Sequence, residues 1–179
     1  MGRDPRGGTP AEVSGASAAR ALAVIKELGF TDVVSIPDGE SRHLYQALVD
    51  EPTIEVYLPT REGEGIALAA GLWVGGRQPF LLIQNTGLME AGDALRGCGI
   101  GPGIPLLLLV GWRGYPGAAA GALPIDSAYP YTEPLLDAWG VPHRRLMGDE
   151  DLDVIEQMAT LAAETSMPAA VVYGYGFTP

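Results

Sequence analysis

The feature that most constrains this fold is the regular interleaving of short apolar runs with longer segments of helical spacing. Six runs are strand-like, and most of them are apolar: 32–36, 54–58, 80–84, 105–110, 142–146 and 169–173. Six helical patterns alternate with them: Glu12–Leu28, Ser41–Val49, Gly63–Val74, Met89–Gly97, Thr132–Trp139 and Asp151–Glu164. Several runs are apolar without alternation, which suits a parallel sheet covered on both faces. The sequence therefore predicts a three-layer α/β/α, doubly wound, mostly parallel six-stranded sheet.

The chain reads as one domain with a short leading tail. Residues 1–10 are rich in Gly, Pro and charge, so we expect them to be disordered, and we expect a single domain over 11–179. Residues 112–131 show little periodic pattern. A stretch of that length inside a compact domain is typical of a functional lid or a mobile segment.

Charge and motif content exclude several classes of function. The 22 acidic and 11 basic residues give a net charge of -11, which repels nucleic acid and anionic lipid. The longest apolar run is too short to span a bilayer and the start lacks a signal-peptide core, so we expect a cytoplasmic protein. Gly-x-Gly-x-x-Gly after the first strand, a P-loop and Gly-x-Ser-x-Gly are all missing. The two histidines lack metal-ligand spacing, so we expect no metal site in this chain.

Polar or Gly-rich segments follow four of the expected strands: PDGES, PTREGE, NTGLME and GWRGYPG. In open parallel sheets the ligand crevice lies beyond the carboxyl ends of the strands. The functional site is therefore expected where these segments meet.

Two glutamates stand at the start of the expected helix Gly63–Val74: Glu62 directly before it and Glu64 in its first turn. One interpretation is electrostatic, because acids in a first helical turn interact favourably with the helix dipole by about 0.3–1 kcal/mol. The other is chemical: the helix is rich in Ala and Gly, so a flat ligand can approach closely, and a carboxylate there can share a proton with a ring nitrogen of a cofactor. The residues alone leave both open.

The block TREGEGIALAAGLWVGGRQPFLLIQNTGLMEAGDALRG resembles the pyrimidine-binding (PYR) domain of thiamine-diphosphate-dependent decarboxylases, above all the sulfopyruvate and phosphonopyruvate decarboxylases. That family carries a glutamate, a glycine nine residues later, and a strand ending in Gln-Asn-Ser-Gly-Leu; here these are Glu62, Gly71 and residues 84–88. The resemblance implies that Glu62 activates the cofactor aminopyrimidine and that Glu64 is a polar neighbour. It also implies cofactor contacts at Asn85, Thr86, Gly87 and Leu88. Independently of the resemblance, the residue pattern offers Thr86 as an ordinary helix N-cap, and the two roles are compatible.

Other segments are similar to the same family and imply a substrate side. SIPDGESRHLYQAL resembles its first strand and loop, and PLLLLVGWRG resembles its fourth strand and the Arg-Gly step that follows. The implied substrate contacts are Asp38, Glu40, Ser41, His43 and Arg113, with Tyr131 as a weaker candidate. The chain departs from the family pattern in three places. Gly39 replaces Ser; Met89 and Glu90 replace Gly-Asn, with Asp93 where Asn is common; and IDSAYPYTEP replaces a histidine-containing segment.

The resemblance implies half of an active site. The Gly-Asp-Gly motif and downstream Asn that bind magnesium and the diphosphate are absent here. The implied protein is the alpha subunit of a heteromer, α2β2 or a multiple, whose separate diphosphate-binding beta subunit holds most of the Mg²⁺ contacts. The implied reaction is decarboxylation of a small 2-oxo acid. A thiamine-diphosphate-dependent carboligase subunit and a non-catalytic ligand-binding or regulatory module remain as alternatives.

Overall fold

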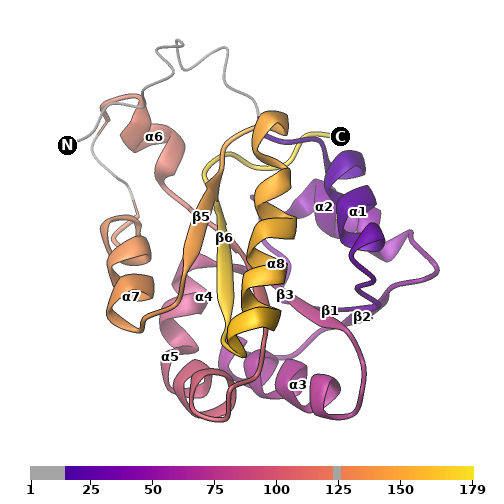
Figure 1. Cartoon of the computed structure of the whole chain (residues 1–179). Helices are drawn as coiled ribbons and strands as arrows, with labels where there is room; N and C mark the ends of the chain where they lie inside the picture. Colours follow the sequence, from indigo (N-terminus) through magenta and orange to yellow (C-terminus); the bar gives the residue numbers. More distant parts are fainter. Residues whose placement is uncertain (1–14, 123–125) are drawn as a thin grey trace.

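The computed structural model describes residues 15–122 and 126–179, so the expected tail over 1–10 lies outside the described residues. A single parallel sheet runs through this part of the chain in the order β2-β1-β3-β4-β6-β5 (Figure 1). Its strands are β1 (Asp32–Ser35), β2 (Glu55–Tyr57), β3 (Pro79–Gln84), β4 (Leu107–Gly111), β5 (His143–Leu146) and β6 (Ala169–Tyr173). Every strand pair in the sheet is parallel, which confirms the predicted fold class.

Helices cover both faces of the sheet, as the unalternated apolar strands predicted (Figure 1). One face carries α1 (Ala18–Glu27), α2 (Arg42–Val49) and α8 (Asp153–Thr165). The other carries α3 (Glu62–Val74), α4 (Asn85–Glu90), α5 (Gly92–Ala94), a π-helical turn (Leu95–Ile100) and α7 (Thr132–Ala138).

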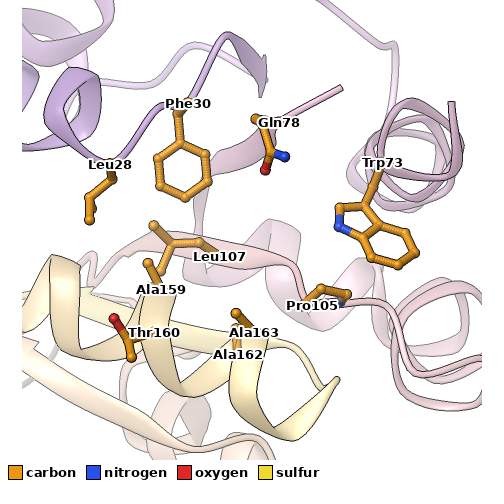
Figure 2. A pocket seen from close by; sticks show the side chains of 10 residues that line it. All are labelled: Leu28, Phe30, Trp73, Gln78, Pro105, Leu107, Ala159, Thr160, Ala162 and Ala163. Carbon is orange, nitrogen blue, oxygen red and sulfur yellow. The ribbon is translucent and has the colours of Figure 1, made fainter. Parts of the chain in front are cut away.

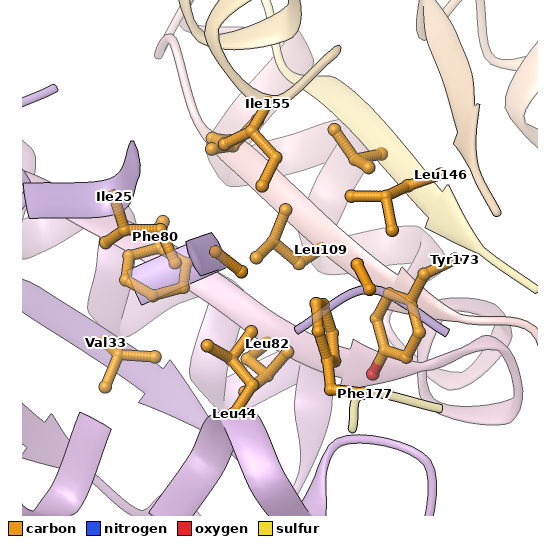
Figure 3. Packing of buried hydrophobic residues seen from close by; sticks show 14 of the residues in the cluster. Ile25, Val33, Leu44, Phe80, Leu82, Leu109, Leu146, Ile155, Tyr173 and Phe177 are labelled. Carbon is orange, nitrogen blue, oxygen red and sulfur yellow. The ribbon is translucent and has the colours of Figure 1, made fainter. Parts of the chain in front are cut away.

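Alternate residues of each strand belong to opposite cores. In β3, Phe80 and Leu82 pack with the α1, α2 and α8 layer, whereas Leu81 and Ile83 pack with the α3 to α7 layer. Figure 3 shows the first of these cores, in which Phe80 lies beside Ile25 of α1 and Leu82 lies beside Leu44 of α2. Burial on both faces fixes the register of the sheet and so fixes the loops at its edges.

Two helices differ from the sequence prediction by more than two residues at one or both ends. The first helix begins at Ala18, and residues 15–17 before it are not helical; the predicted start at Glu12 lies outside the described residues. The reason is a long-range pairing: Ser17 bridges to Thr178, and the Ala18 N–H donates to the Thr178 carbonyl at 2.9 Å. A helix continuing back from Ala18 would have to give up this contact with the end of the chain.

The helix predicted over Met89–Gly97 begins earlier, at Asn85, and continues in three pieces to Ile100. Gln84 is extended and forms the N-cap position, so the expectation of Thr86 as the N-cap is wrong. The physical reason is that the Asn85 side-chain oxygen accepts the Thr86 N–H at 3.0 Å, which satisfies that free helix donor one residue earlier than expected.

The stretch 112–131 is more regular in its described part than the sequence predicts. It contains α6 (Tyr115–Ala119) and a 3-10 turn (Tyr129–Tyr131). The Trp112 ring stacks on Tyr129 at 5.3 Å between centroids, and the Trp112 Nε1–H donates to the Tyr129 carbonyl at 3.0 Å. These aromatic contacts supply packing that a search for apolar periodicity does not detect.

None of the helices within 15–122 and 126–179 combines the length and the apolar content needed to cross a bilayer.

Candidate active site

The carboxyl ends of all the strands meet at one edge of the sheet because every pair is parallel. This carboxyl edge receives the loop after β1, the turn that leads into α3, the start of α4 and the segment after β4. It is the expected position of a ligand crevice in an open α/β sheet. All four polar segments singled out in the sequence begin there.

Glu62 is the first residue of α3 and lies directly against α4. Arg61 before it is extended, and this turn brings the Glu62 side chain onto the backbone of Gly87. A Cβ added to Gly87 would overlap the Cγ, Cδ and Oε1 atoms of Glu62. Only a glycine at position 87 leaves room for the Glu62 side chain in this position. We call this contact of the Glu62 side chain with the Gly87 backbone the Glu62 seat.

The Glu62 carboxylate has no hydrogen bond or ion pair with any residue of the described chain. The side chain is partly exposed at the carboxyl edge. A carboxylate in that state has its lone pairs available for a donor from outside the domain.

Two other carboxylates beside Glu62 are engaged within the protein. Glu64 accepts the Thr60 N–H at 2.9 Å and the Thr60 hydroxyl at 2.7 Å, and these bonds lower its pKa. Glu90, the last residue of α4, accepts the Gly63 N–H at 2.8 Å and pairs with Arg61. The backbone bond from Gly63, followed by the bond from Arg61, lowers the pKa of Glu90. Of these three glutamates, Glu62 alone is left without a bond inside the described chain.

A chain of side-chain hydrogen bonds joins the loop after β1 to the start of α4. The Gln84 amide donates to Glu40 at 2.6 Å, and the Thr86 hydroxyl donates to the Gln84 oxygen at 2.8 Å. Gln84 thus links Glu40 to Thr86. The sequence predicted Glu40 and Thr86 as site residues but did not predict Gln84.

Asp38 and Ser41 form the turn that starts α2. The Ser41 N–H donates to Asp38 Oδ1 at 2.8 Å, whereas Asp38 Oδ2 is buried without a hydrogen-bond partner among the described residues. Burial, together with the charge of Glu40, raises the pKa of Asp38.

The hydroxyl of Tyr173, at the end of β6, is likewise buried without a described hydrogen-bond partner. Burial first, and then the charges of Asp38 and Glu40, raise the pKa of Tyr173 well above its ordinary value. The loop after β1 therefore brings the buried Asp38 carboxylate close enough to the buried Tyr173 phenol for its charge to act on it.

Asn85 and Leu88 are directed into the protein. The Asn85 amide is fully buried and donates to the Thr132 hydroxyl at 3.1 Å and to the Arg113 carbonyl at 3.3 Å. Leu88 is fully buried in the core of the α3 layer. Their side chains hold α4 in place, so any contact of these two residues with a cofactor has to use their backbone.

Arg113 and His43, both expected from the sequence as substrate contacts, already have partners within the chain. The Arg113 guanidinium already pairs with Asp126 at 3.1 Å. His43 lies in the first turn of α2, and its ring accepts a hydrogen bond from Arg42 at 3.1 Å. Tyr131, the weaker candidate, is 59% exposed at the end of the 3-10 turn.

Sequence reasoning missed Gln84, Glu90 and Tyr173 as members of the site. Gln84 ends a strand that the sequence had identified, and Glu90 was noted as a departure from the family pattern. The position of Tyr173 at a strand end was the available signal, but its closeness to the loop after β1 depends on strand order. No group of three or more His, Cys, Asp or Glu side chains able to hold a metal ion occurs within the part of the chain that the structure describes.

The seat of Glu62 fits an aromatic ring nitrogen of a cofactor. Its carboxylate is partly exposed and has no partner among residues 15–122 and 126–179, and the adjoining Gly87 has no side chain that would obstruct a flat ring. A carboxylate in this arrangement can exchange a proton with a heteroaromatic nitrogen.

Three comparisons bear on this site. Residues 17–129 match the family described as "Thiamine pyrophosphate enzyme, N-terminal TPP binding domain". A sulfopyruvate decarboxylase of Methanosarcina acetivorans is 29% identical over 150 residues, which is 83% of this chain and 38% of that protein. A phosphonopyruvate decarboxylase of Streptomyces viridochromogenes is 33% identical over 100 residues, 56% of this chain and 25% of that protein.

A shorter relative matches over nearly its whole length. The sulfopyruvate decarboxylase subunit alpha of Methanococcus maripaludis is 27% identical over 150 residues, 83% of this chain and 88% of that subunit. The family match extends over both Glu62 and Gly87, the two residues that form the seat. The chain belongs to the family of N-terminal, thiamine-pyrophosphate-binding domains of thiamine pyrophosphate enzymes.

Proposed function

We propose that this chain is the alpha subunit of a heteromeric, thiamine-diphosphate-dependent decarboxylase of small 2-oxo acids, of the sulfopyruvate and phosphonopyruvate type. The observation that carries the proposal is the Glu62 carboxylate, seated on Gly87 and without a partner in the described chain. Its neighbours Glu64 and Glu90 are both engaged inside the protein, so Glu62 is the glutamate left to meet a cofactor.

In this proposal Glu62 exchanges a proton with the aminopyrimidine ring of the cofactor. Thiamine diphosphate bound there would supply a nucleophilic carbon and an electron sink for the loss of carbon dioxide from a 2-oxo acid. The protein's own part is to hold the proton at the Glu62 carboxylate and to orient that carboxylate through the Gly87 seat. Asn85, Thr86, Gly87 and Leu88 build the start of α4 against which the ring lies, Thr86 with its hydroxyl and the other three with their backbones.

The loop after β1 is proposed as the substrate side of the same edge. Asp38, Glu40 and Ser41 lie there, and Glu40 is tied to the start of α4 through Gln84 at 2.6 Å. Arg113 contributes a positive charge to the rim, although its pairing with Asp126 must loosen before it can meet a substrate anion. His43 is proposed only as an outer contact, because it already accepts a bond from Arg42.

The second half of the site is proposed to come from a separate beta subunit that binds the diphosphate group and Mg²⁺. Two relatives named as whole decarboxylases are much longer than this chain, which matches 38% and 25% of their lengths. Another relative is named as a subunit alpha and is matched over 88% of its length. An α2β2 assembly, or a multiple of it, places each active site between the two kinds of subunit.

The proposal is tested by purifying the chain with its partner from the native host and assaying carbon dioxide release from sulfopyruvate and from phosphonopyruvate. The expected result is release that requires added thiamine diphosphate and both subunits. Product analysis separates an aldehyde, the decarboxylase outcome, from an acyloin, the carboligase outcome. A chain that is recovered alone and binds no thiamine diphosphate would contradict the proposal and favour a binding or regulatory module.

A further inference from the structure

Glu90 contacts both residues that flank Glu62 in the sequence. Its Oε1 atom pairs with the Arg61 guanidinium, and its Oε2 atom accepts the Gly63 N–H at 2.8 Å. Glu90 lies at the end of α4, the same short helix whose Gly87 supports the Glu62 side chain. One helix therefore supplies both the seat of Glu62 and the anchor of its two neighbours.

An unanchored Arg61 would have one obvious new partner. Its side chain is 73% exposed, and a guanidinium carries five donors that fork readily onto carboxylates. Glu64 is already taken by Thr60, whereas Glu62 has no partner in the described chain. Release of Arg61 from Glu90 would thus direct it to the carboxylate that the cofactor needs.

We propose that Glu90 is a positioning residue that sequesters the Arg61 guanidinium and holds the start of α3, so that Glu62 stays free for the cofactor ring. The inference rests on the proposed function of Glu62. A glutamate is ionised at neutral pH, so Glu90 can hold the Arg61 guanidinium there; the bond from Gly63 and the pair with Arg61 lower the pKa of Glu90 further.

The test variant is Glu90→Gln, because glutamine keeps an oxygen for the Gly63 N–H but loses the charge that holds Arg61. The measurement is the dissociation constant of thiamine diphosphate, by titration calorimetry, in the complete complex of both subunits. We expect binding weakened roughly tenfold, the size of one competing charge-assisted bond. The matched control is Glu64→Gln, which changes a carboxylate in the same helical turn that does not contact Arg61, and we expect it to bind within about twofold of wild type.

The double variant Arg61→Gln/Glu90→Gln separates sequestration from helix capping. If Glu90 acts by holding Arg61 away, removing Arg61 as well restores cofactor affinity to within about twofold of wild type, and Arg61→Gln alone changes little. A double variant that stays as weak as Glu90→Gln would overturn the inference, because capping of α3 would then explain the loss. Melting temperatures of this chain alone identify any variant whose loss is a folding defect.

Glu62→Gln in the same experiment keeps the two proposals apart. If Glu62→Gln abolishes turnover while Glu90→Gln binds the cofactor as wild type does, the role of Glu90 fails and that of Glu62 stands. If Glu62→Gln leaves both binding and turnover unchanged, the proposed function itself fails, and the role of Glu90 falls with it.

Discussion

Carboxylates at the two ends of the strands differ in how far the protein satisfies their hydrogen-bonding capacity. At the amino edge, Asp32 is fully buried and accepts three bonds from Arg77, at 2.6, 3.0 and 3.0 Å, and one from the Thr31 hydroxyl at 2.5 Å. At the carboxyl edge, Glu62 has no partner in the described chain, and Asp38 Oδ2 is buried without one. Both edges are formed by the ends of the same six strands, so the sheet topology does not explain why Asp32 is hydrogen-bonded within the described chain and Glu62 is not.

A hollow at the amino ends of the strands, like Asp32 there, offers a ligand no free titratable group from its lining side chains. It is lined mainly by apolar groups, including Leu28, Phe30, Trp73 and Ala163, with Gln78 at its border (Figure 2). Nothing titratable lines it. The comparison teaches that polar groups satisfied within the protein serve stability, while those left unsatisfied at the carboxyl edge are the ones available for chemistry.

The largest expected effect breaks the carboxyl edge at Glu62. Glu62→Gln keeps the shape of the side chain but cannot exchange the proton, so turnover of the complete complex should fall roughly a thousandfold. The melting temperature of this chain should stay near that of wild type, because Glu62 makes no hydrogen bond in the described chain. Carbon dioxide release and thermal unfolding measure the two effects. Unchanged turnover would remove the contrast between the two edges.

Gly87→Ala tests the seat under Glu62. The added Cβ would overlap the Glu62 side chain, so the carboxylate must move and thiamine diphosphate should bind the complex roughly tenfold more weakly. Gly97→Ala is the matched control, since a Cβ there has nothing within 4 Å. Calorimetric titration compares the two variants, and equal affinities would show that the seat does not position Glu62.

Asp32→Asn breaks the amino edge. Burial raises the pKa of Asp32, but the bonds from Arg77 and Thr31 outweigh it and hold the pKa below its ordinary value. Loss of these charge-assisted bonds should cost about 2 kcal/mol, or roughly 4–8 °C in melting temperature, with turnover unchanged.

The pH dependence of the same variant supplies a second check. A lowered pKa stabilises the folded state above the unfolded value of about 3.9 and loses that contribution as pH falls through the folded value. The gap in melting temperature between wild type and Asp32→Asn should therefore narrow below about pH 4. A gap that is constant with pH would contradict the role of the ionised pair.

The smallest effect, of opposite sign, is expected at Asp38. Its pKa is raised, so the wild type loses stability as pH rises above the ordinary value of about 3.9 and the buried carboxyl ionises. Asp38→Asn keeps the oxygen that accepts the Ser41 N–H and should melt roughly 1–3 °C higher than wild type at pH 7 but not at pH 4. Asp93→Asn, on a side chain that is 91% exposed, is the control and should show no such gain.

The fold was largely predictable from local pattern. The runs at 80–84 and 105–110 are apolar on both faces, and this property predicted a covered parallel sheet. The boundaries failed where distant segments decide them, as at Ala18, whose helix start depends on pairing with Thr178. Residue spacing along the chain carries no information on such a partner.

The candidate site was predictable in its components but not in its contacts. Glu62 and Gly87 were both singled out, yet only the structure places one upon the other. The sequence could not show that Glu64 and Glu90 are engaged within the protein. Glu64 bonds to Thr60, and Glu90 bonds to Gly63 and Arg61, and these contacts appear only in the structure. Residues 1–10, expected to be disordered, lie outside the described residues.

The most direct test of the central claim is a crystal structure of the complete complex with thiamine diphosphate bound. The account predicts a Glu62 carboxylate oxygen within hydrogen-bond distance, about 2.6–3.2 Å, of a ring nitrogen of the aminopyrimidine, with the ring lying beside Gly87 and Arg61 still on Glu90. An aminopyrimidine bound by another residue, with Glu62 left in solvent or paired to Arg61, would contradict it.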